Sequence, residues 1–206
     1  QQDIMSSQAQ GSIMLKSHNQ LTVFDGTPLH NLDATAAAIY VLRNPLDVVL
    51  SVADHFNLSI DQAIDFISDP NTGTATDEQG VAGFLGSWSQ HVESWTRANS
   101  PQFLTLRYED MLDKPLPTFT KVAKLFGIQA SRQELLQAVD FASFKRLLEN
   151  ENKNGFAEKS SHAKRFFRDG RKNQWIEKLT EEQIRRVVSA HREQMAKHNY
   201  LPPKFR

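Results

Sequence analysis

The fold is decided by the stretch Ile39-Tyr40-Val41-Leu42-Arg43-Asn44-Pro45-Leu46-Asp47-Val48-Val49-Leu50-Ser51. The four apolar residues at its start predict a short buried strand. Asn44 can cap a helix, and Pro45 suits the first helical turn because it has no N–H group to lose there. The stretch therefore predicts a strand, a tight turn and a helix, with Arg43 at the carboxyl end of the strand. In α/β sheets ligands bind at that edge, and a helix N-terminus there attracts anions.

The same stretch resembles the 3′-phosphate-binding segment of the sulfotransferase family, which uses 3′-phosphoadenosine 5′-phosphosulfate (PAPS). The family pattern is an apolar strand, then Arg-Asn-Pro-x-Asp, then a Ser on the following helix, and these residue types are all present here. The resemblance implies that Arg43 and Ser51 hold the 3′-phosphate of the nucleotide. A guanidinium is a planar, permanently charged phosphate ligand, and a hydroxyl adds one more donor. For this stretch alone, a plain strand-to-helix turn with a surface arginine remains the alternative.

Composition limits the classes of protein to consider. The 206 residues suffice for one domain with a core, and the 24 basic and 24 acidic residues give zero formal net charge. That balance argues against broad electrostatic binding to nucleic acid or to an anionic membrane. No apolar run approaches the roughly 20 residues that span a bilayer, so we expect no membrane span. The chain has no Cys, hence no disulfide and no Cys-ligated metal, and we expect a cytoplasmic protein.

Short apolar runs separated by helical patterns predict an α/β fold with a parallel sheet. The resemblance makes this more specific and implies a P-loop-like, three-layer α/β/α domain with a central parallel sheet and a helix-rich C-terminal half. We predict strands at residues 13–15, 39–42 and 103–106. We predict helices at residues 45–56, 59–67, 84–96, 116–126, 131–139, 144–150 and 180–198, and loops at residues 19–31 and 69–80.

The tripeptide Lys16-Ser17-His18 follows the first predicted strand and precedes a loop, so its charged side chains can face a cleft at the strand end. Sulfotransferases carry a Lys-Thr-His motif in this place. The resemblance implies that His18 is the catalytic base and that Lys16 neutralises charge on the transferring group. A His with a pKa near neutrality can accept the proton of an attacking hydroxyl, and a Lys can stabilise the leaving phosphate. A Lys-x-His tripeptide alone is more often a pair of surface residues.

Two further segments resemble the parts of the family that lie near the adenine. The predicted strand at residues 103–106 leads into a Tyr-Glu-Asp sequence that begins at Tyr108, and Ser143-Phe144 is similar to the family's Ser-Phe segment. The resemblance implies that Tyr108, Ser143 and Phe144 lie beside the adenine, and an aromatic face suits a purine ring. The alternatives are a half-buried Tyr108 with a solvated acidic pair after it, and a Phe144 that points into the core.

The segment at residues 166–175 resembles the family's C-terminal nucleotide loop, Phe-x-Arg-Lys-Gly-x-x-Gly-Asp-Trp. The resemblance implies that Arg168 reaches the 3′-phosphate and that Gly170 lets the backbone approach it closely. Asp169 replaces a basic residue and adds a repulsive charge, which the basic residues after Gly170 can offset. A charged surface loop is the alternative.

One part of the family pattern is missing from the sequence. Sulfotransferases open with a strand, a Pro-Lys-Ser-Gly-Thr-type loop and a helix, and the loop binds the 5′-phosphosulfate through backbone N–H groups and a Lys. The polar stretch at residues 6–12 has one Gly, no Lys and no predicted strand before it. We therefore expect residues 1–206 to form a single sulfotransferase-like domain that lacks its N-terminal strand, loop and helix, and that is not fully active by itself.

The order of these motifs favours a PAPS-dependent sulfotransferase. Such an enzyme would transfer a sulfuryl group to a hydroxyl or amine of a small-molecule acceptor, release 3′-phosphoadenosine 5′-phosphate (PAP) and use no metal. The identity of the small-molecule acceptor is not predicted. Both a monomer and a homodimer are compatible with the sequence. Two alternatives remain, a catalytically inactive relative that binds the nucleotide and a P-loop nucleotide kinase. The sequence contains no Gly-x-x-x-x-Gly-Lys-Ser/Thr motif, which argues against the kinase.

Overall fold

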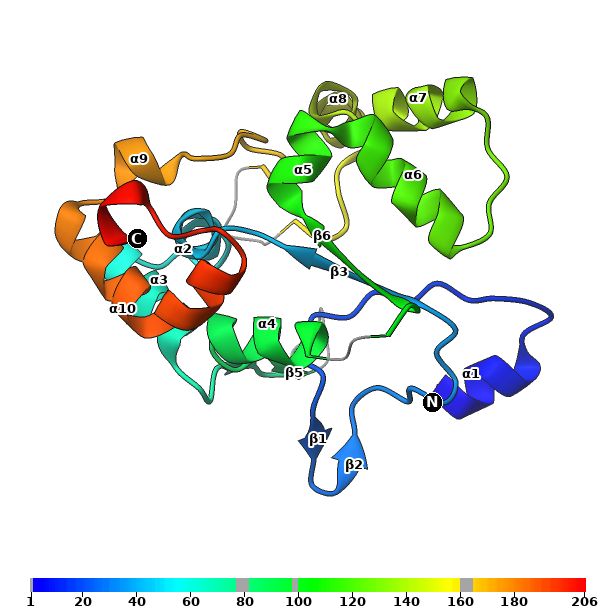
Figure 1. Cartoon of the computed structure of the whole chain (residues 1–206), viewed down its shortest axis with the longest axis horizontal. Helices are drawn as coiled ribbons and strands as arrows, with labels where there is room; N and C mark the ends of the chain where they lie inside the picture. The colour runs from blue at the N-terminus through cyan, green and yellow to red at the C-terminus, as the bar shows by residue number, and fades with distance from the viewer. Residues whose placement is uncertain (1, 77–81, 98–99, 160–164) are drawn as a thin grey trace.

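A two-stranded parallel sheet lies at the centre of the fold (Figure 1). Strand β3 (Ala38–Leu42) pairs with β6 (Phe103–Arg107) so that Leu42 lies opposite Arg107. Parallel strands need a long crossover between them, and helices supply it here. The predicted α/β class with a central parallel sheet is confirmed. The structure, a computed structural model, describes residues 2–76, 82–97, 100–159 and 165–206.

The crossover from β3 to β6 contains three helices whose first turns are capped by side chains. At the first of them the Asn44 side chain accepts a hydrogen bond from the N–H of Leu46 at 3.1 Å, so the predicted cap is confirmed. The other two begin with capping boxes at Ser59 and Ser87, in which a serine and the Gln three residues later bond reciprocally to the backbone. The three helices are α2 (Pro45–His55), α3 (Ile60–Ser68) and α4 (Trp88–Thr96).

The main core lies where α2, α3 and α4 meet the long C-terminal helix α10 (Glu181–Lys197). Apolar residues at helical spacing face this junction, and each fully buried aliphatic side chain contributes about 1.5–3 kcal/mol relative to exposure. Trp88, from the aromatic stripe of α4, is also part of the core. The fully buried aliphatic side chains are Leu42, Leu46, Val49, Ile64, Val92, Val187 and Met195.

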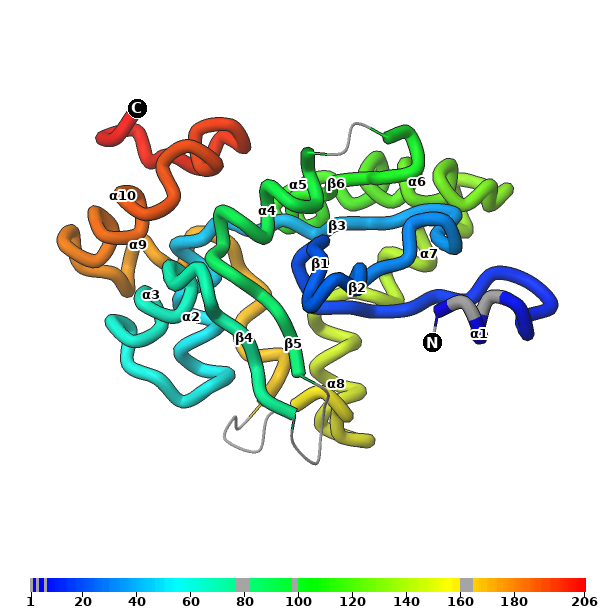
Figure 2. Tube along the Cα trace, turned by 90° about the horizontal axis from the view of Figure 1, so that it is seen from below, coloured from blue at the N-terminus to red at the C-terminus, as the bar shows by residue number. Residues whose placement is uncertain are grey.

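The C-terminal half is rich in helices, as predicted. Figure 1 shows two groups of them, with α5 to α8 above the sheet and α9 and α10 beside α2 and α3 at the carboxyl end of β3; Figure 2 shows this second group from below. Gly127, with a φ of +64°, ends α6 in the left-handed conformation that glycine favours. None of the helices in the described ranges is long and apolar enough to cross a bilayer. The remaining elements are α5 (Tyr108–Asp113), α6 (Pro115–Leu125), α7 (Arg132–Phe141), α8 (Phe144–Asn154), α9 (Trp175–Lys178) and the short 3₁₀ helix η1 (Pro203–Phe205).

Several short elements were not predicted from the sequence. Two antiparallel strand pairs lie in the predicted loops, and the first of them turns at Asp25 and Gly26, whose φ angles are +47° and +72°. Two successive positive φ angles at an Asp-Gly pair are typical of a tight hairpin turn. The elements that were not predicted are α1 (Gln2–Gln8), β1 (Val23–Phe24), β2 (Thr27–Pro28), β4 (Gly73–Thr74) and β5 (Gly83–Phe84), together with α5, α9 and η1. Residues 77–80 of the second predicted loop lie outside the described residues.

One predicted strand and the start of one predicted helix are wrong. Residues 13–15 form no strand, and the side chains of Ile13 and Met14 are 48% and 79% exposed, because no described strand lies beside them to pair with. The helix predicted from residue 84 begins only at Trp88, since Phe84 belongs to β5 and Gly86 has a φ of +61°. A left-handed residue just before a serine cap sets a later start than the apolar spacing suggests.

The outer edge of β3 is open. In the described part of the chain β3 pairs only with β6. Val41 is 49% exposed although its neighbour Leu42 is 1% exposed. An open edge of a central strand presents unpaired N–H and C=O groups to whatever lies beside it.

Candidate active site

Arg43 stands at the turn between β3 and α2 and contacts two of the other predicted site residues. Its Nη1 donates a hydrogen bond to Ser51 Oγ at 3.0 Å, and its guanidinium carbon lies 4.5 Å from the centre of the Tyr108 ring. Its Nη2 donates to the backbone oxygen of Arg171 at 3.3 Å. Its Nε is buried and has no hydrogen-bond partner in the described part of the chain. The structure thus gathers Arg43, Ser51 and Tyr108 at the carboxyl edge of the sheet, with donor capacity to spare.

Asp47 joins the C-terminal loop to α2. Its side chain is almost fully buried, and its carboxylate accepts hydrogen bonds from the backbone N–H groups of Asn173 at 2.7 Å and Trp175 at 3.0 Å. A buried carboxylate is costly unless such donors satisfy it. This role of Asp47 was not predicted from the sequence, because an acidic residue in the first turn of a helix is common for electrostatic reasons alone.

Glu109, which follows β6, forms hydrogen bonds with the residue that caps α2 and with Tyr200 near the C-terminus. Its Oε1 accepts a hydrogen bond from the N–H of Asn44 at 3.1 Å, and its Oε2 accepts one from the Tyr200 hydroxyl at 2.7 Å. It is therefore a buried residue and not part of a solvated acidic pair. The parallel register, with Leu42 opposite Arg107, sets Glu109 beside the cap of α2. This role also went unpredicted, because its partners lie far away in the sequence.

Phe144 and Gly170, both predicted near the nucleotide, lie in direct contact. A Cβ atom added to Gly170 would stand 2.2 Å from Phe144 Cδ2, so only glycine fits against the ring. Gly170 also has a φ of +61°, which side chains disfavour. Ser143 precedes α8 as its cap residue, without a capping hydrogen bond from its side chain. The structure therefore explains the glycine at position 170 by its contact with the Phe144 ring, and a close approach to the 3′-phosphate stays a prediction.

Arg168 lies over the exposed side of α2. Its Nη1 is 3.1 Å from Asp54 Oδ1, one helical turn beyond Ser51. The neighbouring Asp169 pairs with Arg171, whose Nε donates to Oδ1 at 2.6 Å. This hydrogen bond holds the pKa of Asp169 below its usual value. The repulsive charge expected at Asp169 is therefore offset within the loop itself.

Lys16 and His18 lie in an extended segment, and both side chains are exposed. Lys16 forms an ion pair with Glu158. Partial desolvation and the charge of Lys16 lower the pKa of His18, while Glu158 opposes the shift and His55 adds to it. Because His55 is the last residue of α2, the segment faces the same helix that carries Ser51.

Helix α4 holds the segment that contains His18. His91 Nε2 lies 3.1 Å from the backbone oxygen of His18, and Trp95 Nε1 donates to the backbone oxygen of Asn19 at 3.0 Å. On its other side His91 Nδ1 lies 3.0 Å from the hydroxyl of Tyr40 in β3. Burial raises the pKa of Tyr40 and lowers that of His91, so the Tyr40 hydroxyl donates to Nδ1 and Nε2–H donates to His18. This link was not predicted from the sequence, because the residues that His91 joins lie far from it in the chain.

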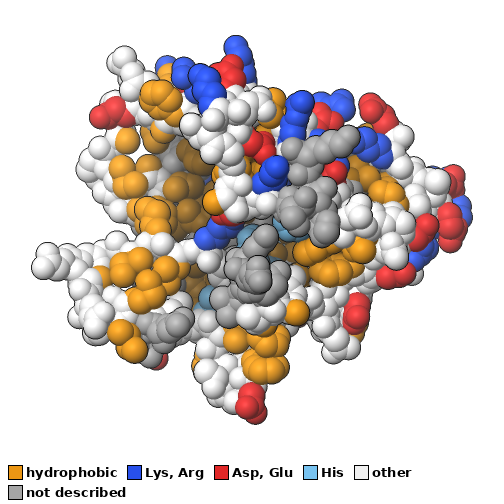
Figure 3. Space-filling model, turned by 180° about the vertical axis from the view of Figure 1, so that it is seen from behind, with side chains coloured by type: hydrophobic (Ala, Val, Ile, Leu, Met, Phe, Trp, Pro, Cys, Tyr) orange, Lys and Arg blue, Asp and Glu red, His pale blue; other side chains and the backbone are white. Residues whose placement is uncertain are grey.

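Figure 3 shows histidine and basic side chains together at the centre of one face, next to a hollow lined by hydrophobic side chains. The predicted residues form three groups. The Arg43 cluster consists of Arg43, Ser51 and Tyr108, and Phe144 with Gly170 forms a second group. The third is the segment with Lys16 and His18, which lies near His55 at the end of α2. No three His, Asp or Glu side chains of the described residues come close enough together to hold a metal ion.

The sequence model of the sulfotransferase domain matches residues 5–199. The chain belongs to the sulfotransferase family. Sulfotransferase 1A1 of Rattus norvegicus is 30% identical over 140 residues, which are 66% of this chain and 45% of that protein. The 3-beta-hydroxysteroid sulfotransferase of Cavia porcellus is 27% identical over 213 residues, which are 98% of this chain and 69% of that protein. The chain therefore spans about half the length of the first of these relatives.

Solved sulfotransferase structures share the fold. Mouse sulfotransferase SULT7A1, complexed with PAP, superposes with a TM-score of 0.66 and 22% identity, over 86% of this chain and 64% of that one. Retinol dehydratase, in complex with androsterone and PAP, superposes with a TM-score of 0.67 and 19% identity, over 91% of this chain and 54% of that one. These likenesses confirm the predicted P-loop-like α/β fold.

Proposed function

We propose that the protein transfers a sulfuryl group from PAPS to a hydroxyl or amine of a small-molecule acceptor. The observation that carries the proposal is the contact of Arg43 with Ser51 at the turn between β3 and α2. A guanidinium and a hydroxyl that converge beside a helix N-terminus form a site for a phosphate dianion. Family membership and the PAP-bound relatives of the same fold support the choice of nucleotide.

The nucleotide would bind along α2. Arg43 and Ser51 would turn their donors toward the 3′-phosphate, and the buried Nε of Arg43 has no partner among the described residues to give up. Arg168 would reach the same phosphate from the next turn of α2, where it now pairs with Asp54. Tyr108, Ser143 and Phe144 would lie near the adenine. No metal takes part in this arrangement, because the cationic side chains carry the charge of the phosphate.

The proton of the acceptor would pass to His18. The lowered pKa keeps this imidazole neutral near pH 7, which is the form that can accept a proton. PAPS would supply the sulfuryl group and leave as PAP. As the acceptor oxygen bonds to sulfur, the bond from sulfur to the phosphate oxygen breaks and its electron pair stays on the phosphate. Lys16 would stabilise that developing charge after leaving Glu158.

The 5′ end of the nucleotide needs a further phosphate-binding element, since the sequence of residues 1–206 contains no phosphate loop. The open edge of β3 and the half-exposed Val41 offer a place for it. We propose that a strand followed by such a loop pairs with this edge, next to Arg43. Residues 1–206 would then be a sulfotransferase-like domain without its first strand, loop and helix.

An inactive relative is the second candidate, and one contact favours it. Lys16, the residue proposed to stabilise the leaving group, is paired with Glu158 and so is partly neutralised. Such a protein would bind PAP through Arg43 and Ser51 and transfer nothing. The two candidates differ only in turnover, so an assay of transfer separates them.

The test is an assay of PAP release from PAPS with a panel of phenols, alcohols and amines, performed on the longest natural form of the protein that contains this chain. We expect acceptor-dependent release that His18→Asn lowers by a factor of about 10² to 10⁴. Exposed Lys153 provides the control, since Lys153→Gln should leave the rate unchanged. Binding of PAP without release for every acceptor would instead support the inactive relative, and failure to bind PAP would contradict both candidates.

A further inference from the structure

A second hollow lies beside β6, where α6 approaches the ends of α4 and α10. Its volume is about 370 Å³, within the range of small-molecule sites. Three cationic side chains line it, one from each of three elements: Arg107 from β6, Lys121 from α6 and Lys197 from α10. His198 adds an imidazole, and threonine hydroxyls complete the polar lining. The hollow is separate from the Arg43 cluster, with which it shares no residue.

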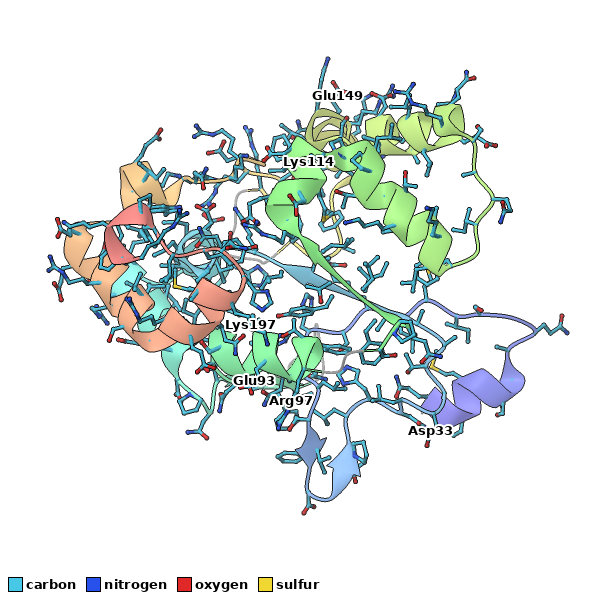
Figure 4. All side chains as sticks on the ribbon, viewed as in Figure 1. Asp33, Glu93, Arg97, Lys114, Glu149 and Lys197 are labelled. Atoms are coloured by element: carbon cyan, nitrogen blue, oxygen red, sulfur yellow. The ribbon has the colours of Figure 1, made fainter. Side chains whose placement is uncertain are left out.

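The charge of the hollow is positive. Asp110 is the carboxylate among its described lining residues, against three cations. Lys121 and Lys197 are exposed and form no ion pair with any described residue. Figure 4 shows Lys197 at the end of α10, beside α4. The labelled Glu93 and Arg97 of this region carry opposite charges, and neither residue lines the hollow. The cations therefore converge on the hollow without a matching set of acidic groups.

Two buried side-chain nitrogens at this place have no hydrogen-bond partner in the described part of the chain. Arg107 Nε and His198 Nε2 are both buried and lack a hydrogen-bond partner among the described residues. The nearest carboxylate oxygen to Arg107 Nε, Glu109 Oε2, lies 3.9 Å away and already accepts from Tyr200. A buried polar group without a partner destabilises the folded protein, so the unpaired Nε–H of Arg107 points to a missing acceptor.

We propose that this hollow binds a small anion with a phosphate or sulfate group, at a site distinct from the nucleotide site. The tetrahedral group would accept hydrogen bonds from the Arg107 guanidinium and the His198 imidazole, and Lys121 and Lys197 would neutralise its charge. Arg107 is suited to this because its planar guanidinium, stacked 4.5 Å from the centre of the Tyr200 ring, is held in one orientation. The volume suits a free ion or a small ester better than a polymer, and the zero net charge of the chain agrees with a local site. The proposal does not depend on sulfuryl transfer.

The test measures thermal unfolding and calorimetric binding with inorganic phosphate, with sodium chloride holding the ionic strength constant. An Arg43→Ala background removes phosphate binding at the nucleotide site. We expect saturable stabilisation by phosphate, and Lys121→Gln combined with Lys197→Gln should weaken binding about tenfold or more. Lys114→Gln combined with Lys153→Gln is the matched control, because it removes two charges from exposed lysines outside the hollow and should change the Kd less than twofold.

A second measurement locates the anion. In the unliganded protein burial lowers the pKa of His198, and Lys197 and Arg107 lower it further. Bound phosphate should raise this pKa in an NMR titration of the imidazole and leave the signals of His18 unchanged. Inorganic sulfate and glucose 6-phosphate are parallel probes, and tighter binding of the ester would assign the site to an esterified ligand. Stabilisation no greater than that by chloride, or equal losses in both double variants, would overturn the proposal.

Discussion

The carboxylate of Asp47 on α2 accepts a hydrogen bond from the backbone N–H of Trp175, 128 positions later in the chain, at 3.0 Å. Its other oxygen accepts from the N–H of Asn173 at 2.7 Å. One buried side chain thereby fixes the loop that carries Arg168 against the helix that carries Ser51. The two parts of the proposed 3′-phosphate site are therefore held together before any nucleotide binds.

This link should be measurable as stability. Asp47→Asn should lower the free energy of unfolding by about 2–3 kcal/mol, because an amide nitrogen would then face a backbone N–H in the interior. Asp33→Asn, at an exposed position labelled in Figure 4, is the matched control and should change it by less than about 0.5 kcal/mol. Urea denaturation of both variants gives the comparison. Equal stability of the two variants would contradict the role assigned to Asp47.

A comparison of Gly170 with Gly127 separates the cost of a left-handed backbone from the cost of a clash with the Phe144 ring. Both have positive φ angles, +61° and +64°, but an added Cβ meets the Phe144 ring only at Gly170 and nothing within 4 Å at Gly127. Each Gly→Ala change should cost about 1–2 kcal/mol for the left-handed backbone. Gly170→Ala should cost about 1–3 kcal/mol more through overpacking and should also weaken PAP binding. Urea denaturation measures the two costs, and equal costs would show that the ring contact does not matter.

His191 should make stability depend on pH. Its imidazole is buried between Ser89 and Ser68, and burial lowers its pKa from 6.5 to about 4. As the pH falls below 6.5, the unfolded chain binds a proton that the folded protein does not, so this residue's contribution is present above pH 6.5 and is lost toward pH 4. The loss should reach about 3 kcal/mol.

The His191 prediction is checked by the difference in unfolding free energy between the wild type and His191→Gln. That difference should shrink as the pH falls from 7 to 4, since Gln does not titrate in this range. Measuring the difference removes the effects of all other titrating groups. A difference that stays constant over this range would contradict a neutral, buried His191.

His91 should control the order of the segment that contains His18. His91→Phe removes the hydrogen bond to the His18 backbone and the link to Tyr40 in β3. We expect hydrogen exchange at the amides of Gln20 and Leu21, which bond to Phe84 and Ser94, to rise about tenfold or more.

The control for this experiment is Glu93→Gln, an exposed position on the same helix. It should leave the exchange of both amides unchanged. If His91→Phe also leaves them unchanged, α4 does not hold the segment through His91, and the positioning of His18 needs another explanation.

Local signals in the sequence were sufficient for the central motif. The strand, the Asn44 cap, Pro45 in the first turn and α2 all follow from residues that are close together in the chain. The capping serines and the glycine after α6 likewise act within one helical turn. Such elements could be predicted because their causes are local.

Contacts over long sequence distances could not be predicted. Glu109 reads as a solvated residue until the parallel register places it beside Asn44 and the C-terminal segment brings Tyr200 to it. The strand expected at residues 13–15 failed for the opposite reason, since an apolar run forms a strand only beside a partner and the structure describes none there. The helix that carries His91 could be predicted from its apolar spacing, but that spacing gives no sign of the contacts of His91 with Tyr40 and with the His18 backbone.

The central claim is the 3′-phosphate site, and calorimetry of PAP against 5′-AMP tests it most directly, because the two nucleotides differ only in that phosphate. We predict that the 206-residue chain binds PAP at least about tenfold more tightly than 5′-AMP. Arg43→Ala should abolish the preference, whereas Arg132→Gln, at an exposed position, should keep it. Equal affinity for both nucleotides, or a preference that survives Arg43→Ala, would contradict the account.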